Sequence, residues 1–224
     1  MTFGYQVTQF LFHLHLPFKL PGNTAVLSVH QQPEVQKACT DFYNRFFSDT
    51  RKRQLLIGIN PGRFGGGVTG IPFTDPIRLE QHCGIPNPFP KKQELSSAFI
   101  YDMIGAYGGV ERFYNRFYIT AVSPLGFTSQ GKNLNYYDDK LLMKRIEPFV
   151  ADCMEKQLEF GIDRGTCFCI GEGENLKYLT RLNDTYRWFG SVLGLPHPRY
   201  IMQYKLKQKE AYINRYTELL QGIA

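Results

Sequence analysis

An asparagine directly after an apolar segment is the first residue of this sequence with clear chemical potential. The segment QLLIGI, residues 54–59, is followed at once by Asn60, Pro61 and Gly62. A carboxamide does not take up a proton near neutral pH, so it cannot act as a strong base, but its oxygen can orient a water molecule. An asparagine before proline is also a common turn former. Asn60 is therefore a candidate catalytic residue, with turn formation as the alternative.

The residues around Asn60 are rich in glycine. Residues 59–73 read INPGRFGGGVTGIPF and include five glycines. Glycine is costly in conformational entropy, so this run predicts a backbone that approaches a flat ligand closely. The letters GGGVTG fit the pattern G-x-G-x-x-G, but they lie well beyond the strand and Pro72 prevents a helix from starting there. We therefore expect neither a dinucleotide-binding fold nor, without Gly-Lys-Ser/Thr, a P-loop.

A second polar candidate stands near the C-terminal end, in the segment LPHPRYIMQYK at 195–205. The imidazole of His197 could donate a hydrogen bond, even as the neutral ring. A histidine between two prolines is otherwise often a surface or core-edge residue. His197 is thus a candidate functional residue, with a structural position as the alternative.

Alternating helical and extended patterns must position these residues. Apolar spacing predicts helices over 34–47, 95–107, 139–161, 174–182 and 207–221, and strands over 54–59, 117–122, 166–171 and 199–204. Apolar strands that alternate with helices form parallel sheets covered on both faces. We therefore predict a single α/β domain over 1–224. Ligands of such sheets bind at the carboxyl ends of the strands, here the loops that begin at 60, 123, 171 and 190.

Composition narrows the class of protein. The 224 residues carry 26 Lys and Arg against 20 Asp and Glu, a net charge of +6 that suits a polyanionic partner. Residues 1–22 do not resemble a signal peptide, and no apolar stretch is long enough to span a membrane, so we expect a cytoplasmic protein with no membrane partner. The five cysteines include no Cys-x-x-Cys pair, which predicts neither a disulfide framework nor a metal site.

The glycine-rich segment resembles the first motif of the single-strand-selective monofunctional uracil-DNA glycosylases. That motif reads GMNPGPFGxxxTGVPFG, and here residues 58–65 read GINPGRFG and residues 69–73 read TGIPF, with no gap between them. The segment AVSPLGF at 121–127 is similar to the family's NxCPLxF, and LPHPRYIMQYK is similar to its HPSPRNPxxNK. The resemblance implies a three-layer α/β/α fold with a central four-stranded parallel sheet.

The resemblance also implies a reaction, the hydrolysis of the bond between deoxyribose and uracil in DNA. The sugar becomes oxocarbenium-like and uracil leaves as an anion, so catalysis depends on electrostatic partners for both charges. Asn60 would position the water and His197 would stabilise the departing base. A second pairing of the motif places Leu195 in the family's histidine slot; we favour His197. No lysine stands where an amine would attack the sugar, which indicates a monofunctional enzyme without a cofactor.

Base binding would involve the glycines and the end of the first motif. Gly62 would let the backbone approach the flipped base, and Phe73 would stack on it. Gly66 stands where the family has a side chain beside the base C5 atom, which predicts room for 5-hydroxymethyluracil. Ala121 replaces the family's uracil-reading asparagine, so we expect Ser123 to read the base more permissively and to admit xanthine or hypoxanthine.

The implied partner is single- and double-stranded DNA containing deaminated bases, with no obligate protein partner. Arg199 matches the family's wedge residue, which fills the gap left by the flipped base. Lys205 is a candidate for phosphate contacts, as are Lys91, Lys92, Lys207 and Lys209. We expect a monomer.

Two other classes of function fit part of the pattern. A non-catalytic module that binds single-stranded DNA would use basic residues with Phe73, Tyr200 and Tyr204, but would not need Asn60. An α/β enzyme that processes nucleosides would also use a glycine-rich loop. An abasic product distinguishes a glycosylase from the first class, and inactivity on free nucleosides distinguishes it from the second.

Overall fold

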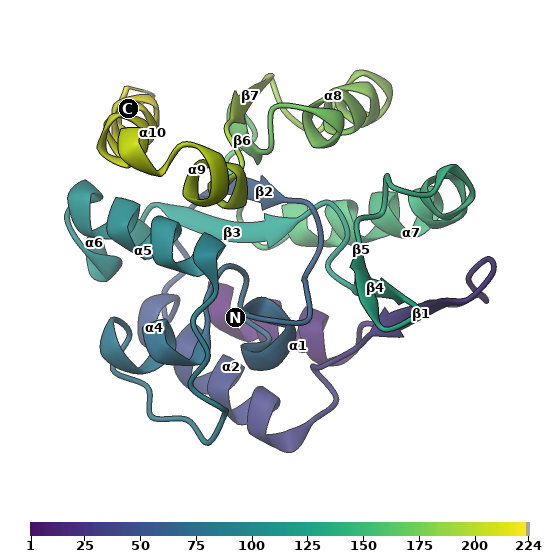
Figure 1. Ribbon diagram of the computed structural model, residues 1–224, viewed down its shortest axis with the longest axis horizontal. Helices are drawn as coiled ribbons and strands as arrows, with labels where there is room; N and C mark the ends of the chain where they lie inside the picture. The colour runs from purple at the N-terminus through teal and green to yellow at the C-terminus, as the bar shows by residue number, and fades with distance from the viewer. Residues whose placement is uncertain (223–224) are drawn as a thin grey trace.

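The central sheet of the computed structural model, which describes residues 1–222, has four parallel strands in the order β3-β2-β6-β7 (Figure 1). These strands are β2 Gln54–Gly58, β3 Phe117–Ala121, β6 Thr166–Ile170 and β7 Ser191–Leu195. Every residue of β2 and β3 is buried, because helices cover both faces of the sheet. The predicted three-layer α/β/α class is confirmed.

The position of the fourth strand was predicted wrongly. Residues 199–204 form most of helix α9, Pro198–Tyr204, and the fourth strand is β7. Pro198 occupies the first turn, where its fixed φ and missing N–H favour a helix, and His197 caps that turn. Pro198 and Ile201, three residues apart, form the buried side of the helix. The chain therefore leaves the fourth strand for the site after Leu195, and not at 190.

Helices on the two faces of the sheet are identified by their contacts with neighbouring residues of β3. The rings of Phe3 and Phe47 pack on Tyr118, at 5.3 and 6.1 Å between centroids. On the opposite face, Tyr107 packs on Phe117 at 5.5 Å. The first face carries α1 Phe3–Phe12, α2 Pro33–Phe46, α7 Lys140–Leu158 and α8 Glu174–Tyr186. The second carries α5 Leu95–Tyr107, α6 Val110–Tyr114, α9 and α10 Lys209–Gln221 (Figure 1).

Short helical segments complete the described chain: α3 Gly66–Thr69, α4 Pro76–Gln81 and the 3-10 helix Leu206–Gln208. None of the helices within residues 1–222 is both long and apolar enough to cross a membrane.

A second, antiparallel sheet was not predicted. It consists of β1 Thr24–Leu27, β4 Gly126–Ser129 and β5 Lys132–Leu134, in the order β1-β4-β5. The β4–β5 turn places Gln130 and Gly131 at φ 49° and 71°, as a tight hairpin with two left-handed residues requires. This sheet matters for function because β5 leads into the residues that contact Asn60.

Candidate active site

A cavity of about 540 Å³ opens at the carboxyl ends of β2 and β3. It brings together residues from two distant segments of the chain, 60–73 and 197–199, all of which the sequence had suggested: Asn60, Gly62, Gly66, Phe73, His197 and Arg199. Ser123 and Lys205 are not among the described residues that line it. The cavity lies where parallel sheets place their ligands, at the ends of the strands.

Backbone groups hold the Asn60 carboxamide in one orientation. Its Nδ2 donates to the carbonyl of Leu134 at 3.2 Å and to that of Pro61 at 3.3 Å. Its Oδ1 accepts the N–H of Tyr136 at 3.0 Å. A carboxamide oxygen accepts two hydrogen bonds, so Oδ1 retains one acceptor position. The segment Leu134–Tyr136 thus orients Asn60 at the end of β2 and leaves its oxygen able to bind a water.

His197 is held as a neutral ring. It is the N-cap residue of α9, and its Nδ1 accepts the backbone N–H of Arg199 at 3.1 Å. A ring nitrogen that accepts a hydrogen bond carries no proton, so the proton lies on Nε2. Burial, with a smaller contribution from the positive charge of Arg199, lowers the pKa of His197 to about 4. The side chain is therefore a neutral hydrogen-bond donor through Nε2 at physiological pH.

Phe73 lies beside His197, with 6.2 Å between the two ring centroids. Its φ of 51° is left-handed, an uncommon conformation for an aromatic residue and one often found at functional sites. The ring packs against Gly58, the last residue of β2, where an added Cβ would lie 2.9 Å from it. Glycine at 58 therefore allows the ring to lie directly against the strand end, at the wall of the cavity.

The glycine run serves the loop itself as well as the cavity. A Cβ on Gly67 would lie 1.9 Å from the carbonyl oxygen of Gly62, so only glycine allows the loop to fold back on its own backbone. Gly62 and Gly66 do line the cavity, and a Cβ on Gly66 would lie 3.1 Å from the carbonyl oxygen of Ile71. Of these three glycines, Gly62 and Gly66 are thus placed to let the backbone approach a ligand, and Gly67 serves the fold of the loop.

The structure places Ser123 away from the cavity lining. Ser123 is fully buried and its hydroxyl donates to the carbonyl of Leu125 at 2.8 Å, which stabilises the turn after β3. Ala121, the residue that departs from the family motif, does line the cavity. The predicted role of Ser123 in reading the base is therefore not supported by any contact of its side chain with the cavity.

The predicted DNA contacts fall into two groups. Arg199 is exposed and lines the cavity, whereas the half-buried Lys205 caps the C-terminal end of α9. Lys91 and Lys209 form ion pairs with Glu80 and Asp102. Arg199 is therefore the best placed of these cations to contact a strand whose base enters the cavity.

Several lining residues were missed by sequence reasoning. Asn133, Asn135 and Tyr137 come from β5 and the turn after it, whereas the exposed tyrosines 200 and 204 of α9, which also line the cavity, had been named only for the alternative DNA-binding function. The asparagine- and tyrosine-rich run GKNLNYYDD was the available signal, but β5 has only three residues and gave no recognisable strand pattern. Within the described residues, no cluster of His, Cys, Asp or Glu could hold a metal ion.

Comparison with known proteins identifies the family of this chain. The family description "Uracil DNA glycosylase superfamily" matches residues 45–221, which is most of the chain. The crystal structure of wild-type Pedobacter heparinus SMUG2 is similar, with a TM-score of 0.96 and 42% sequence identity. That similarity covers 100% of this chain and 98% of the SMUG2 chain. No curated protein matches. The chain therefore belongs to the uracil-DNA glycosylase superfamily, in its SMUG-like branch, and is a DNA glycosylase that hydrolyses N-glycosyl bonds.

Proposed function

We propose that this enzyme removes uracil from DNA by flipping the nucleotide into the cavity and hydrolysing its N-glycosidic bond, which leaves an abasic site. One observation carries the proposal: an oriented carboxamide, Asn60, and a neutral imidazole, His197, line the same cavity at the ends of the central strands. A cytoplasmic location fits DNA as the substrate.

Asn60 and His197 would act on the two charges that develop during the reaction. The free acceptor position on Asn60 Oδ1 would hold a water beneath the anomeric carbon of the sugar. The Nε2–H of His197 would donate to the uracil oxygen that becomes negative as the bond breaks. Because neither group takes up or releases a proton near neutral pH, orientation and electrostatic stabilisation would supply most of the acceleration.

The cavity lining supports hydrolysis without strand cleavage. Strand-cleaving glycosylases need an amine nucleophile that attacks the sugar, and lysine is the side chain that supplies one. None of the described residues that line this cavity is a lysine. The enzyme would therefore be monofunctional. The family resemblance further implies that it works as a monomer with no cofactor and no obligate protein partner.

Two small residues in the lining support a broad range of bases. Gly66 presents no side chain to the cavity, which would leave space for a substituent on C5 such as the hydroxymethyl group. Ala121 provides no hydrogen bond to the uracil edge, so xanthine and hypoxanthine would also be accepted. Gly62 and Phe73 would hold the base, with Ser123 as the predicted but more remote reader.

DNA contacts would surround the cavity mouth. Arg199 would fill the gap left by the flipped nucleotide, and Lys205 would contact a phosphate. Flipping costs least from single strands and mismatches, so both single- and double-stranded DNA with deaminated bases would serve.

Labelled oligonucleotides with one uracil, 5-hydroxymethyluracil, xanthine or hypoxanthine test this proposal. Each is incubated with the enzyme as a single strand and as a duplex, then divided into samples with and without hot alkali. We expect strand breaks only after alkali, and on all of these bases. Breaks without alkali would contradict the monofunctional mechanism, and activity on uracil alone would contradict the broad range. Binding without an abasic product, or activity on free nucleosides only, would favour the alternative functions.

A further inference from the structure

The segment that orients Asn60 is itself only partly held by the small sheet. Leu134, whose carbonyl accepts from Asn60, is the last residue of β5 and pairs with Phe127 of β4. Tyr136, whose N–H donates to Asn60, lies two residues beyond the end of that strand. A further interaction is needed to fix the backbone at Tyr136, and the Tyr136 side chain provides it.

The Tyr136 side chain connects this backbone to the central sheet. Tyr136 is fully buried, and its hydroxyl donates to Asn175 Oδ1 at 2.7 Å. Asn175, itself 1% exposed in the first turn of α8, donates from Nδ2 to the carbonyl of Ile170, the last residue of β6, at 3.1 Å. Hydrogen bonds therefore connect the end of β6 to Asn175 and Asn175 to the Tyr136 side chain, and the backbone N–H of the same tyrosine contacts Asn60.

His197 packs close to the same junction. Gly171, which follows β6, donates its N–H to the carbonyl of Leu195 at 2.7 Å. A Cβ on Gly171 would lie 3.3 Å from Asn175 Cβ and 3.8 Å from His197 Cδ2. Asn175 thus stands between the elements that carry the two candidate catalytic residues.

We infer that Tyr136 and Asn175 are positioning residues. They hold the Asn60 carboxamide in the orientation in which its bound water can attack the sugar. The inference rests on the proposed role of Asn60. Loss of the Tyr136 hydroxyl leaves buried Asn175 Oδ1 without that donor and releases the backbone that orients Asn60. Rates of oriented reactions fall steeply with displacement, by about 100-fold for 1 Å. A shift too small to disturb the fold would therefore slow the excision of uracil.

A double-mutant cycle between Tyr136→Phe and Asn60→Ala measures this coupling. The readouts are the single-turnover rate constant of uracil excision with enzyme in excess and the Kd for uracil-containing DNA. We expect Tyr136→Phe alone to lower the rate constant by about 10-fold and to leave Kd unchanged. In the Asn60→Ala background, where no carboxamide remains to be oriented, the same substitution should lower it by less than about 2-fold.

Tyr178→Phe is the matched control. Tyr178 is buried and its ring packs on Tyr136 at 4.9 Å between centroids, but its hydroxyl donates to Glu147 and not to Asn175. This variant should keep the wild-type rate constant. Asn175→Ala removes the acceptor of the Tyr136 hydroxyl, so it should also slow excision. Combined with Tyr136→Phe, it should cause no further loss, because the two variants break the same hydrogen bond.

Two results would overturn the inference. Equal losses from Tyr136→Phe in both backgrounds would show a general structural effect that is independent of Asn60. Wild-type activity of Tyr136→Phe would show that the hydroxyl does not position Asn60. Wild-type activity of Asn60→Ala, by contrast, would first overturn the proposed function, and the inference with it.

Discussion

Backbone groups fix the orientation of both candidate catalytic side chains. Asn60 is oriented by the carbonyl of Leu134 and the N–H of Tyr136, and His197 by the N–H of Arg199. The sequence singled out both residues through the motifs that contain them, and their roles stay predictions. It could not predict the orientation of Asn60, since Leu134 and Tyr136 are 74 and 76 positions away.

The neutral state of His197 gives a prediction for pH. Since the folded protein holds the pKa of His197 at about 4, the side chain should remain a neutral donor down to that pH. Protonation of Nδ1 would break its hydrogen bond with the Arg199 N–H and displace the ring. We expect the single-turnover rate constant to be level from pH 8 to pH 5 and to fall as the pH approaches 4.

The same depressed pKa affects stability. Because the ordinary pKa of 6.5 applies in the unfolded chain, the stability that comes from the neutral ring is present above pH 6.5 and is lost as the pH falls towards 4. Circular dichroism at each pH separates unfolding from loss of chemistry. A loss of activity centred near pH 6.5 in the folded enzyme would contradict the role of His197 as a neutral donor. The role would also be contradicted if the His197→Gln variant, whose side chain does not titrate, lost activity near pH 4 as the wild-type enzyme does.

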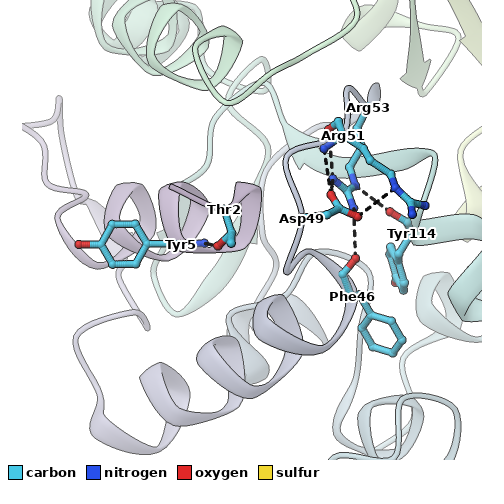
Figure 2. Close-up of polar contacts among 7 residues, drawn as sticks. All are labelled: Thr2, Tyr5, Phe46, Asp49, Arg51, Arg53 and Tyr114. Carbon is cyan, nitrogen blue, oxygen red and sulfur yellow. Dashed lines mark hydrogen bonds and ion pairs between the residues drawn. The ribbon is translucent and has the colours of Figure 1, made fainter.

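At the scale of elements, Arg53 joins the N-terminal helices to the sheet. Figure 2 shows its guanidinium among backbone carbonyls and the Asp49 carboxylate. The fully buried side chain donates to Tyr114 and Phe46 carbonyl oxygens at 2.8 and 3.2 Å and to Asp49 Oδ1 at 2.8 Å. The rings of Phe3 and Phe47 flank it at 4.8 and 4.6 Å. Although burial raises the pKa of Asp49, hydrogen bonds from Arg53 and the Arg51 backbone lower it on balance.

Removal of the Arg53 guanidinium should destabilise the protein. Arg53→Met keeps the length of the side chain but leaves buried carbonyls unpaired and Asp49 without its buried partner, so the free energy of unfolding should fall by about 3 kcal/mol. Arg51→Met is the control, because Arg51 also pairs with Asp49 but its side chain is 65% exposed. We expect its cost to stay below about 1 kcal/mol in the same urea titration. Equal costs for the two variants would contradict the structural role of Arg53.

Elements were predicted well where their apolar pattern is long. The helices over 34–47 and 95–107 and the strand over 54–59 are present within a few residues of the expected bounds. Residues 199–204 were mistaken for a strand because their apolar residues also fit a short extended run. The capping of the first turn by His197, which decides the outcome, depends on a side-chain hydrogen bond that the apolar pattern does not reveal.

At the scale of the whole molecule, the central sheet was predictable and the cavity lining was predictable only in part. Alternation of strands and helices was sufficient for the parallel sheet and for the end of the sheet at which the cavity lies. The antiparallel sheet was not predictable, because its strands have only three or four residues and pair Thr24 with Ser129, which are more than a hundred positions apart in the sequence. Leu134 at the end of this sheet and Tyr136 just after it orient Asn60, so the geometry of Asn60 depends on a part of the fold that was not predicted from the sequence.

The most direct test of the proposed function is the single-turnover rate of uracil excision by the wild-type enzyme and by Asn60→Ala. Asn214→Ala is the matched control, because Asn214 is an exposed asparagine of α10 that is outside the cavity lining. We predict abasic sites from the wild-type enzyme and the control at equal rates, and a rate at least about 100-fold lower from Asn60→Ala. Excision by Asn60→Ala at the wild-type rate would contradict the central proposal that Asn60 positions the attacking water.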